Sequence, residues 1–166
     1  MNIDFLKRLA LFLILLLVQA LVLNHIHLFN YATPLLYVYF VLSFRRGYPK
    51  WAILLWSFLL GISIDVFSNT PGLAASSMTL IALLQPYTLE LFLQREAEDN
   101  FQPAICTMGL AKYSLFALII TFVYCLVFFT LETFTFFNAL EWLLSVLGST
   151  LLSFILILVI DNLRKE

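Results

Sequence analysis

The sequence predicts an all-α fold: a polytopic membrane bundle of six transmembrane helices with both termini in the cytoplasm. Of the 166 residues, 63% are hydrophobic and only 11% are charged, whereas soluble domains average roughly 45–50% and about 25%. The apolar residues form runs separated by short polar stretches, and the basic residues gather at alternate stretches. Residues 1–166 are therefore predicted to form a single transmembrane domain in a lipid bilayer.

The apolar runs define six predicted helices, most of them close to the roughly 20 residues that cross a hydrocarbon core. The second run is short, so we expect this helix to extend into the preceding "HLFNYATP" or to tilt. Pro86, in the fourth run, is expected to kink its helix or to start a new surface segment. The six helices are predicted at approximately residues 6–23, 31–44, 51–67, 71–93, 111–130 and 142–160.

The basic residues predict the orientation, because cytoplasmic loops retain Lys and Arg. In the six-helix arrangement all nine basic residues fall on one side of the membrane. The opposite side carries "NHIHLFN", "SNTPG" and "LETFTFFNALE", which contain none. Both termini are therefore predicted to be cytoplasmic. The basic residues are Lys7, Arg8, Arg45, Arg46, Lys50, Arg95, Lys112, Arg164 and Lys165.

The first apolar run also permits a second interpretation. Lys7 and Arg8, the apolar run and "VQA" at Val18–Ala20 follow the order of a cleavable signal peptide. Cleavage there would leave five helices in the same orientation. The apolar "LVL" after the possible cleavage site favours retention of the first helix.

Small residues recur at every fourth position on three of the predicted helices, which places them on one face of each. Such faces let helix backbones approach closely in lipid. We interpret them as packing surfaces within the bundle, with contact to a partner's helix as the alternative. The three sets are Ser57, Gly61 and Asp65; Ala117, Thr121 and Cys125; and Ser145, Ser149 and Ser153, with Gly148 beside the last set.

Asp65 is an acid inside an apolar run, in the stretch "GISIDVFSNTPG". It follows Trp51 by 14 residues, which places it about 21 Å across a core of about 30 Å. We expect its carboxylate to accept hydrogen bonds from backbone donors at the start of the fourth helix, where Thr70 would be the N-cap and Pro71 would lie in the first turn. A ligand or partner contact is the alternative. The candidate site comprises Ser57, Gly61, Asp65, Asn69, Thr70, Pro71 and Gly72.

The remaining polar residues give weak signals for chemistry. His25 and His27 form only a weak metal pair without a nearby cysteine or carboxylate. Cys106 and Cys125 have no metal-ligand spacing, and we interpret them as small packing residues. The acidic loop "QREAEDN" is expected to be solvated or to contact a cytoplasmic partner. We therefore predict a protein that is not an enzyme, with no catalytic, metal or cofactor site and no nucleic-acid partner.

Several stretches resemble the MreD family of rod shape-determining membrane proteins, in its short form. They are "VLNHIHLFNYATPLLYVYFVL", "SFLLGISIDVFSNTPGLAASS", "QP", "AKYSLFALI" and "FFTLETFTF", and together they cover nearly the whole chain. The most specific part is the order Gly61, Asp65, Pro71 and Gly72. The family commonly reads Pro-Leu-Gly in this turn, whereas this chain reads Pro71-Gly72-Leu73.

The resemblance implies an inner-membrane scaffold of the cell-elongation machinery. Such a protein would bind the single-span protein MreC and would help couple MreB filaments to the polymerase RodA and its penicillin-binding transpeptidase. The family is also similar to the six-helix substrate-binding components of energy-coupling-factor vitamin transporters, which supplies a transport subunit as the alternative function. A vitamin site would need several polar groups around a cavity, and the outer half of this sequence offers few outside its loops. The scaffold is the preferred prediction.

Overall fold

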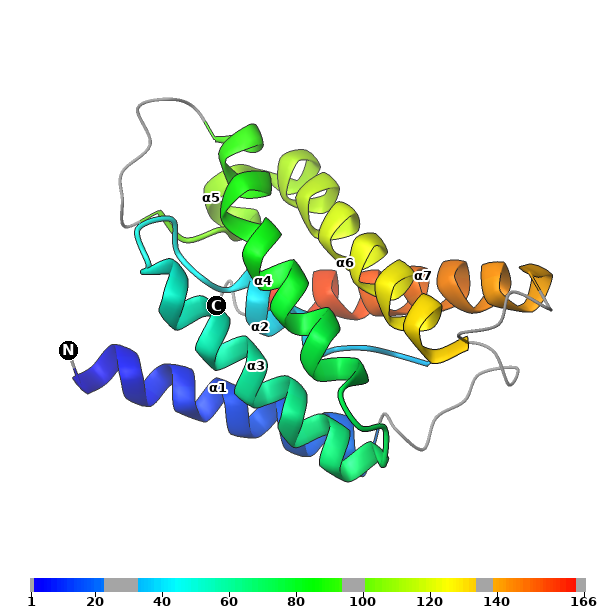
Figure 1. The fold of residues 1–166 in the computed structure, drawn as a ribbon. Helices are drawn as coiled ribbons and strands as arrows, with labels where there is room; N and C mark the ends of the chain where they lie inside the picture. Colours follow the sequence, from blue (N-terminus) through cyan, green and yellow to red (C-terminus); the bar gives the residue numbers. More distant parts are fainter. Residues whose placement is uncertain (1, 23–32, 94–100, 134–138, 164–166) are drawn as a thin grey trace.

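The computed structural model describes residues 2–22, 33–93, 101–133 and 139–163, with no side-chain description for residues 2–4. Within these ranges the long elements of the chain are helices and there is no strand, as the all-α prediction expects. Long helices surround a short central one, α2 (Figure 1). The helices of the described ranges are α1 (Asn2–Leu21), α2 (Val38–Leu42), α3 (Lys50–Ser68), α4 (Leu73–Phe92), α5 (Ile105–Met108), α6 (Leu110–Thr133) and α7 (Ala139–Leu163).

Three of the described helices, α3, α6 and α7, are long and apolar enough to cross a membrane. Many large apolar side chains on the helices also point away from the bundle, among them Leu55 and Val66 of α3 and Leu151 and Ile155 of α7. A soluble protein would expose such contiguous apolar surface at a large cost. These features indicate a membrane protein, as the composition predicts.

The faces with small residues lie inside the bundle. An added Cβ on Gly61 of α3 would lie 2.5 Å from the Cα of Ala75 in α4, so only glycine permits this close approach of the two backbones. Thr121 and Cys125 of α6 are fully buried, as is Ser153 of α7. The interpretation of these faces as packing surfaces within the bundle is confirmed.

The prediction of a continuous helix at residues 31–44 is wrong for the part of this range that the structure describes. Thr33–Leu35 are not helical, a turn follows, and α2 spans only Val38–Leu42 before the chain leaves the helix at Ser43. The prolyl ring of Pro34 removes an amide donor and favours an extended conformation for the preceding residue, Thr33. The segment Thr33–Phe44 nevertheless passes through the centre of the molecule, and most of its residues are buried.

Polar side chains of the neighbouring helices bind the backbone of this central segment. The Gln19 side chain of α1 donates to the Pro34 carbonyl (3.0 Å) and accepts from the Leu36 amide (3.1 Å). Gln85 of α4 donates to the Phe44 carbonyl at 3.2 Å. Non-helical backbone at membrane depth is tolerated only where the protein itself surrounds it and satisfies its polar groups.

The first residues of the central segment, 33–35, run beside α7 in an extended form. The Thr33 amide donates to Ser149 Oγ (3.1 Å) and the Leu35 amide donates to Ser153 Oγ (2.8 Å). Two residues of the segment thus cover the same length as four residues of α7. Four helical residues rise about 6 Å, so the segment advances about 3 Å per residue, as a strand does.

The start and course of α4 differ from the prediction in two details. The helix begins at Leu73, with Gly72 at the N-cap position in a left-handed conformation (φ 84°). Thr70 is therefore not the N-cap, and Pro71 lies before the helix. The helix then continues through Pro86 to Phe92, so no new surface segment starts at that proline.

Candidate functional site

The carboxylate of Asp65 lies at the turn between α3 and α4. Its Oδ1 accepts from the Ala74 amide (2.8 Å) and from the Thr70 hydroxyl (3.1 Å), and its Oδ2 accepts from the Ala75 amide (2.9 Å). Ala74 and Ala75 occupy the second and third positions of α4, whose amides have no partner within the helix. Asp65 therefore takes the place of an N-cap side chain, which Gly72 lacks. The predicted bonding of Asp65 is confirmed.

Little of the Asp65 carboxylate is accessible to a ligand. The residue is 6% exposed, and its two carboxylate oxygens already accept three hydrogen bonds. Its main-chain carbonyl accepts from the amides of Asn69 and Thr70. The side chain thus connects the last turn of α3 to the first turn of α4, and its role here is to fix the turn.

The other predicted site residues do not form one cluster around Asp65. Asn69 ends α3 in a left-handed conformation (φ 56°, ψ 36°) and is exposed, as are Pro71 and Gly72. Gly61 lies one turn away from Asp65, against α4. Ser57 lies two turns away from Asp65, fully buried, with no hydrogen-bond partner for its hydroxyl among the described residues. Only Thr70 bonds the Asp65 carboxylate through its side chain.

A second buried carboxylate, Asp161 in the last turn of α7, was not predicted as a site residue. It is 4% exposed, and it accepts from the Ile105 amide at the start of α5 (2.7 Å) and from the Tyr39 hydroxyl of α2 (3.2 Å). Asp161 thus accepts a hydrogen bond from an amide at the start of α5, as Asp65 does at the start of α4. It lies just beyond the predicted end of the last helix, so the sequence did not show that α7 buries it.

A pair of buried tyrosines connects the central segment to α6. The hydroxyls of Tyr37 and Tyr124 are hydrogen-bonded to each other, and both side chains are fully buried. Their rings meet edge to face, with centroids 5.5 Å apart and an interplanar angle of 88°. One hydroxyl donates and the other accepts, so the bond connects the central segment to α6. The pattern of apolar runs gives no signal for this pairing.

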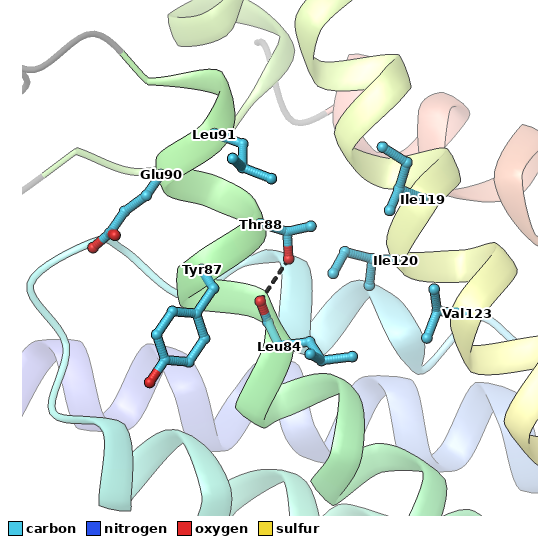
Figure 2. A pocket seen from close by; sticks show the side chains of 8 residues that line it. All are labelled: Leu84, Tyr87, Thr88, Glu90, Leu91, Ile119, Ile120 and Val123. Atoms are coloured by element: carbon cyan, nitrogen blue, oxygen red, sulfur yellow. Dashed lines mark hydrogen bonds between the residues drawn. The ribbon is translucent and has the colours of Figure 1, made fainter.

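An open groove with a volume of about 490 Å³ lies on the surface of the bundle between α4 and α6. In Figure 2 the side chains of Leu84, Thr88 and Leu91 on α4 face those of α6 across it. The Thr88 hydroxyl donates to the Leu84 carbonyl of its own helix (2.6 Å), so it offers little to a ligand. The residues that line the groove are Leu84, Tyr87, Thr88, Glu90, Leu91, Ile119, Ile120 and Val123.

Some predicted features lie outside the described residues, namely His25, His27 and the acidic loop at residues 94–100. Of the two cysteines, Cys106 is exposed in α5 and Cys125 is buried in α6. The packing role predicted for Cys125 is therefore confirmed, and that predicted for Cys106 is wrong.

No family model matches the chain, and the comparisons with curated proteins and with solved structures give no match either. The class that the fold defines is a helical membrane protein in which several buried polar side chains, such as Gln19 and Asp65, bond the backbone of the chain itself.

Proposed function

We propose that this protein is a non-enzymatic scaffold of the inner membrane, similar in role to MreD, that crosses the membrane six times with both termini in the cytoplasm. It binds an MreC-like single-span protein. Through this protein or beside it, the scaffold contacts RodA, a penicillin-binding transpeptidase and filaments of MreB. The sequence resemblance, centred on Gly61 and Asp65, is the reason for naming this machinery.

The observation that carries the scaffold function is the use of the buried polar side chains. Gln19, Gln85, Asp65 and Asp161 each bond the backbone of the chain itself. A site for catalysis or small-molecule binding needs polar groups that converge on a cavity. Here the polar groups hold helices and the central segment in fixed positions, which favours a frame for partner proteins.

The direction of the chain supports six passes. Arg8 near the start of α1 stacks on the rings of Phe44 and Tyr48, 4.7 and 3.8 Å from their centroids. Near the end of α1, Gln19 contacts Leu36. The central segment thus runs antiparallel to α1 and supplies the second pass, in place of the predicted helix. In Figure 1, α3, α4, α6 and α7 then alternate in direction.

The vitamin-transport alternative has less support. A transport subunit of that kind would bind its substrate through polar groups near the outer end of the bundle. The groove between α4 and α6 is lined mainly by aliphatic side chains, and it lies along the half of α4 that is remote from the Asp65 turn. This groove does not resemble a site for a polar vitamin.

Depletion of the protein from a rod-shaped cell that carries it tests the proposal. We expect the cells to become round while vitamin uptake stays unchanged, and expression of the wild-type chain to restore the rod shape. Purification in mild detergent should recover an MreC-like protein, identified by mass spectrometry. Normal shape together with a vitamin requirement would overturn the scaffold function in favour of transport.

A further inference from the structure

The groove between α4 and α6 has the size and chemistry of a site for an acyl chain. Its lining is predominantly aliphatic, with Leu84 and Leu91 from one helix and Ile119, Ile120 and Val123 from the other. Leu84, Leu91 and Ile119 are exposed in the structure, and Ile119 belongs to α6, which is long and apolar enough to cross a membrane. In a bilayer this surface faces lipid, and its hollow must be filled by apolar matter because a void forfeits dispersion contacts.

The lining residues favour an acyl chain over a partner's helix. Helices that dock in lipid use small residues, which allow their backbones to approach. Thr88 is the one small residue among the eight that line the groove, and none of them is glycine, alanine or serine. The small residues described above, such as Gly61 and Ser153, are already buried inside the bundle. A flexible chain of methylene groups can follow a groove between large branched side chains, whereas a helix needs a smoother surface.

A basic residue lies on the same face of α6, toward one end of the groove. Lys112 precedes Ile119 by seven residues and Val123 by eleven, and both spacings return to the same side of a helix. The seven residues place Lys112 about 10 Å beyond Ile119 along the axis. Lys112 is exposed and, among the described residues, makes no hydrogen bond or ion pair. It is also in the first turn of α6, where the helix dipole favours an anion.

The acid at the groove does not oppose an anion near Lys112. Glu90 is among the lining residues, but Figure 2 shows its carboxylate on the side of α4 that faces away from α6. Tyr87 also points away from α6, and its hydroxyl accepts from Lys50 Nζ at 3.4 Å. This surface of α6 is therefore apolar at Ile119 and carries a positive charge at Lys112.

We propose that the groove binds an anionic membrane phospholipid, with an acyl chain between α4 and α6 and the headgroup phosphate beside the Lys112 ammonium. The proposal depends on the membrane location of the helices and not on the scaffold function. A phospholipid is the molecule that presents both parts at the required separation: a hydrocarbon chain, and a phosphate at the level where a basic residue leaves the hydrocarbon core. The bound lipid would seal the gap between the two helices.

The test is native mass spectrometry of the purified full-length chain, titrated with phosphatidylglycerol and with phosphatidylcholine of identical acyl chains. We expect the wild type to retain one bound phosphatidylglycerol under the same conditions in which it loses phosphatidylcholine. Lys112→Gln should weaken phosphatidylglycerol binding about five-fold, the effect of one basic side chain near an anionic surface, and should leave phosphatidylcholine unchanged. Lys7→Gln, an exposed basic residue of α1, is the matched control and should change neither affinity.

A second pair of variants tests the groove itself. Ile119→Trp should fill the groove and abolish retention of phosphatidylglycerol, whereas Leu118→Trp should not, since Leu118 is about equally exposed (38% against 37%) but does not line the groove. Equal retention of the two lipids by the wild type, or equal losses in Lys112→Gln and Lys7→Gln, would overturn the proposal. So would a partner helix or second copy that crosslinks to position 119 and excludes lipid.

Discussion

At the scale of the residue, the two buried carboxylates share one function. Asp65 accepts from the first-turn amides of α4, and Asp161 accepts from the first amide of α5. A helix start leaves several amide groups without partners, and in a membrane protein water is not always present to bind them. The carboxylates supply those partners from a neighbouring turn or helix. Each therefore fixes the relative position of two elements.

Substitution of Asp65 should reveal this role through stability. Asp65→Asn keeps one acceptor oxygen and replaces the other with an NH2 donor, which leaves one backbone amide unpaired at about 1–3 kcal/mol. Asp65→Leu leaves the Ala74 and Ala75 amides unpaired, at about 1–3 kcal/mol for each. Thermal unfolding in detergent measures the ranking, with Ser76→Ala on the exposed face of the same turn as the control. Equal stability of the three Asp65 forms, with loss of partner binding in both variants, would instead make Asp65 a contact residue.

At the scale of the element, the helices were largely predictable and the central segment was not. The apolar runs that form α3, α6 and α7 end within about three residues of the predicted limits, since composition alone identifies long apolar helices. The stretch "PLLYVYFVL" is equally apolar, but its aromatic and β-branched residues fit a buried strand as well as a helix. Pro34 was the local signal against a helix there.

The same contrast applies to the candidate site. The bonds of Asp65 were predictable because its partners follow within ten residues. Those of Gln19 and Asp161 were not, because a local pattern does not show which distant backbone groups lack partners. Ser149, for example, bonds the amide of Thr33 across 116 residues of sequence. Polar residues in apolar runs signal such bonds but do not identify their partners.

Gln19 provides a test of the central segment. Gln19→Leu should leave the Leu36 amide and the Pro34 carbonyl unpaired in the dry interior, at about 1–3 kcal/mol for each group. Gln102→Leu is the control, because Gln102 is only half-buried and its bond to the Ser43 carbonyl is long, at 3.4 Å. Thermal unfolding in detergent should therefore show a much larger loss for Gln19→Leu. Similar losses in the two variants would mean that the amide of Gln19 does not support the segment.

At the scale of the whole molecule, the positions of the basic residues and the directions of the helices indicate the same orientation in the membrane. The start of α1, the connection from α2 to α3 and the start of α6 carry basic residues, among them Arg8, Arg46 and Lys112. In Figure 1 these parts lie toward one end of the bundle, and the Asp65 turn lies toward the other. Cytoplasmic loops retain basic residues, which makes the first end cytoplasmic in the proposed topology.

Cysteine labelling in intact cells measures this topology. In a chain with Cys106→Ser, single cysteines at Arg46 and Lys112 should resist an impermeant thiol reagent, whereas cysteines at Asn69 and Glu132 should react. Buried Cys125 remains as an internal control that should stay unlabelled. After the cells are opened, positions 46 and 112 should react as well. Labelling of position 46 or 112 in intact cells would contradict both the orientation and the count of six passes.

The extended backbone of residues 33–35 has a consequence for synthesis of the protein. Two of its amide partners, Ser149 and Ser153, belong to α7, which is made more than 100 residues after this stretch. Until α7 is made, the amides of Thr33 and Leu35 lack these acceptors, and lipid cannot replace them. We therefore expect the insertion machinery to shelter this stretch until α7 has been made. A cysteine at Leu35 should be accessible to a membrane-permeant thiol reagent in chains arrested before Ala139 and protected once α7 is in place. The extended stretch thus depends on α7 for the pairing of its backbone amides.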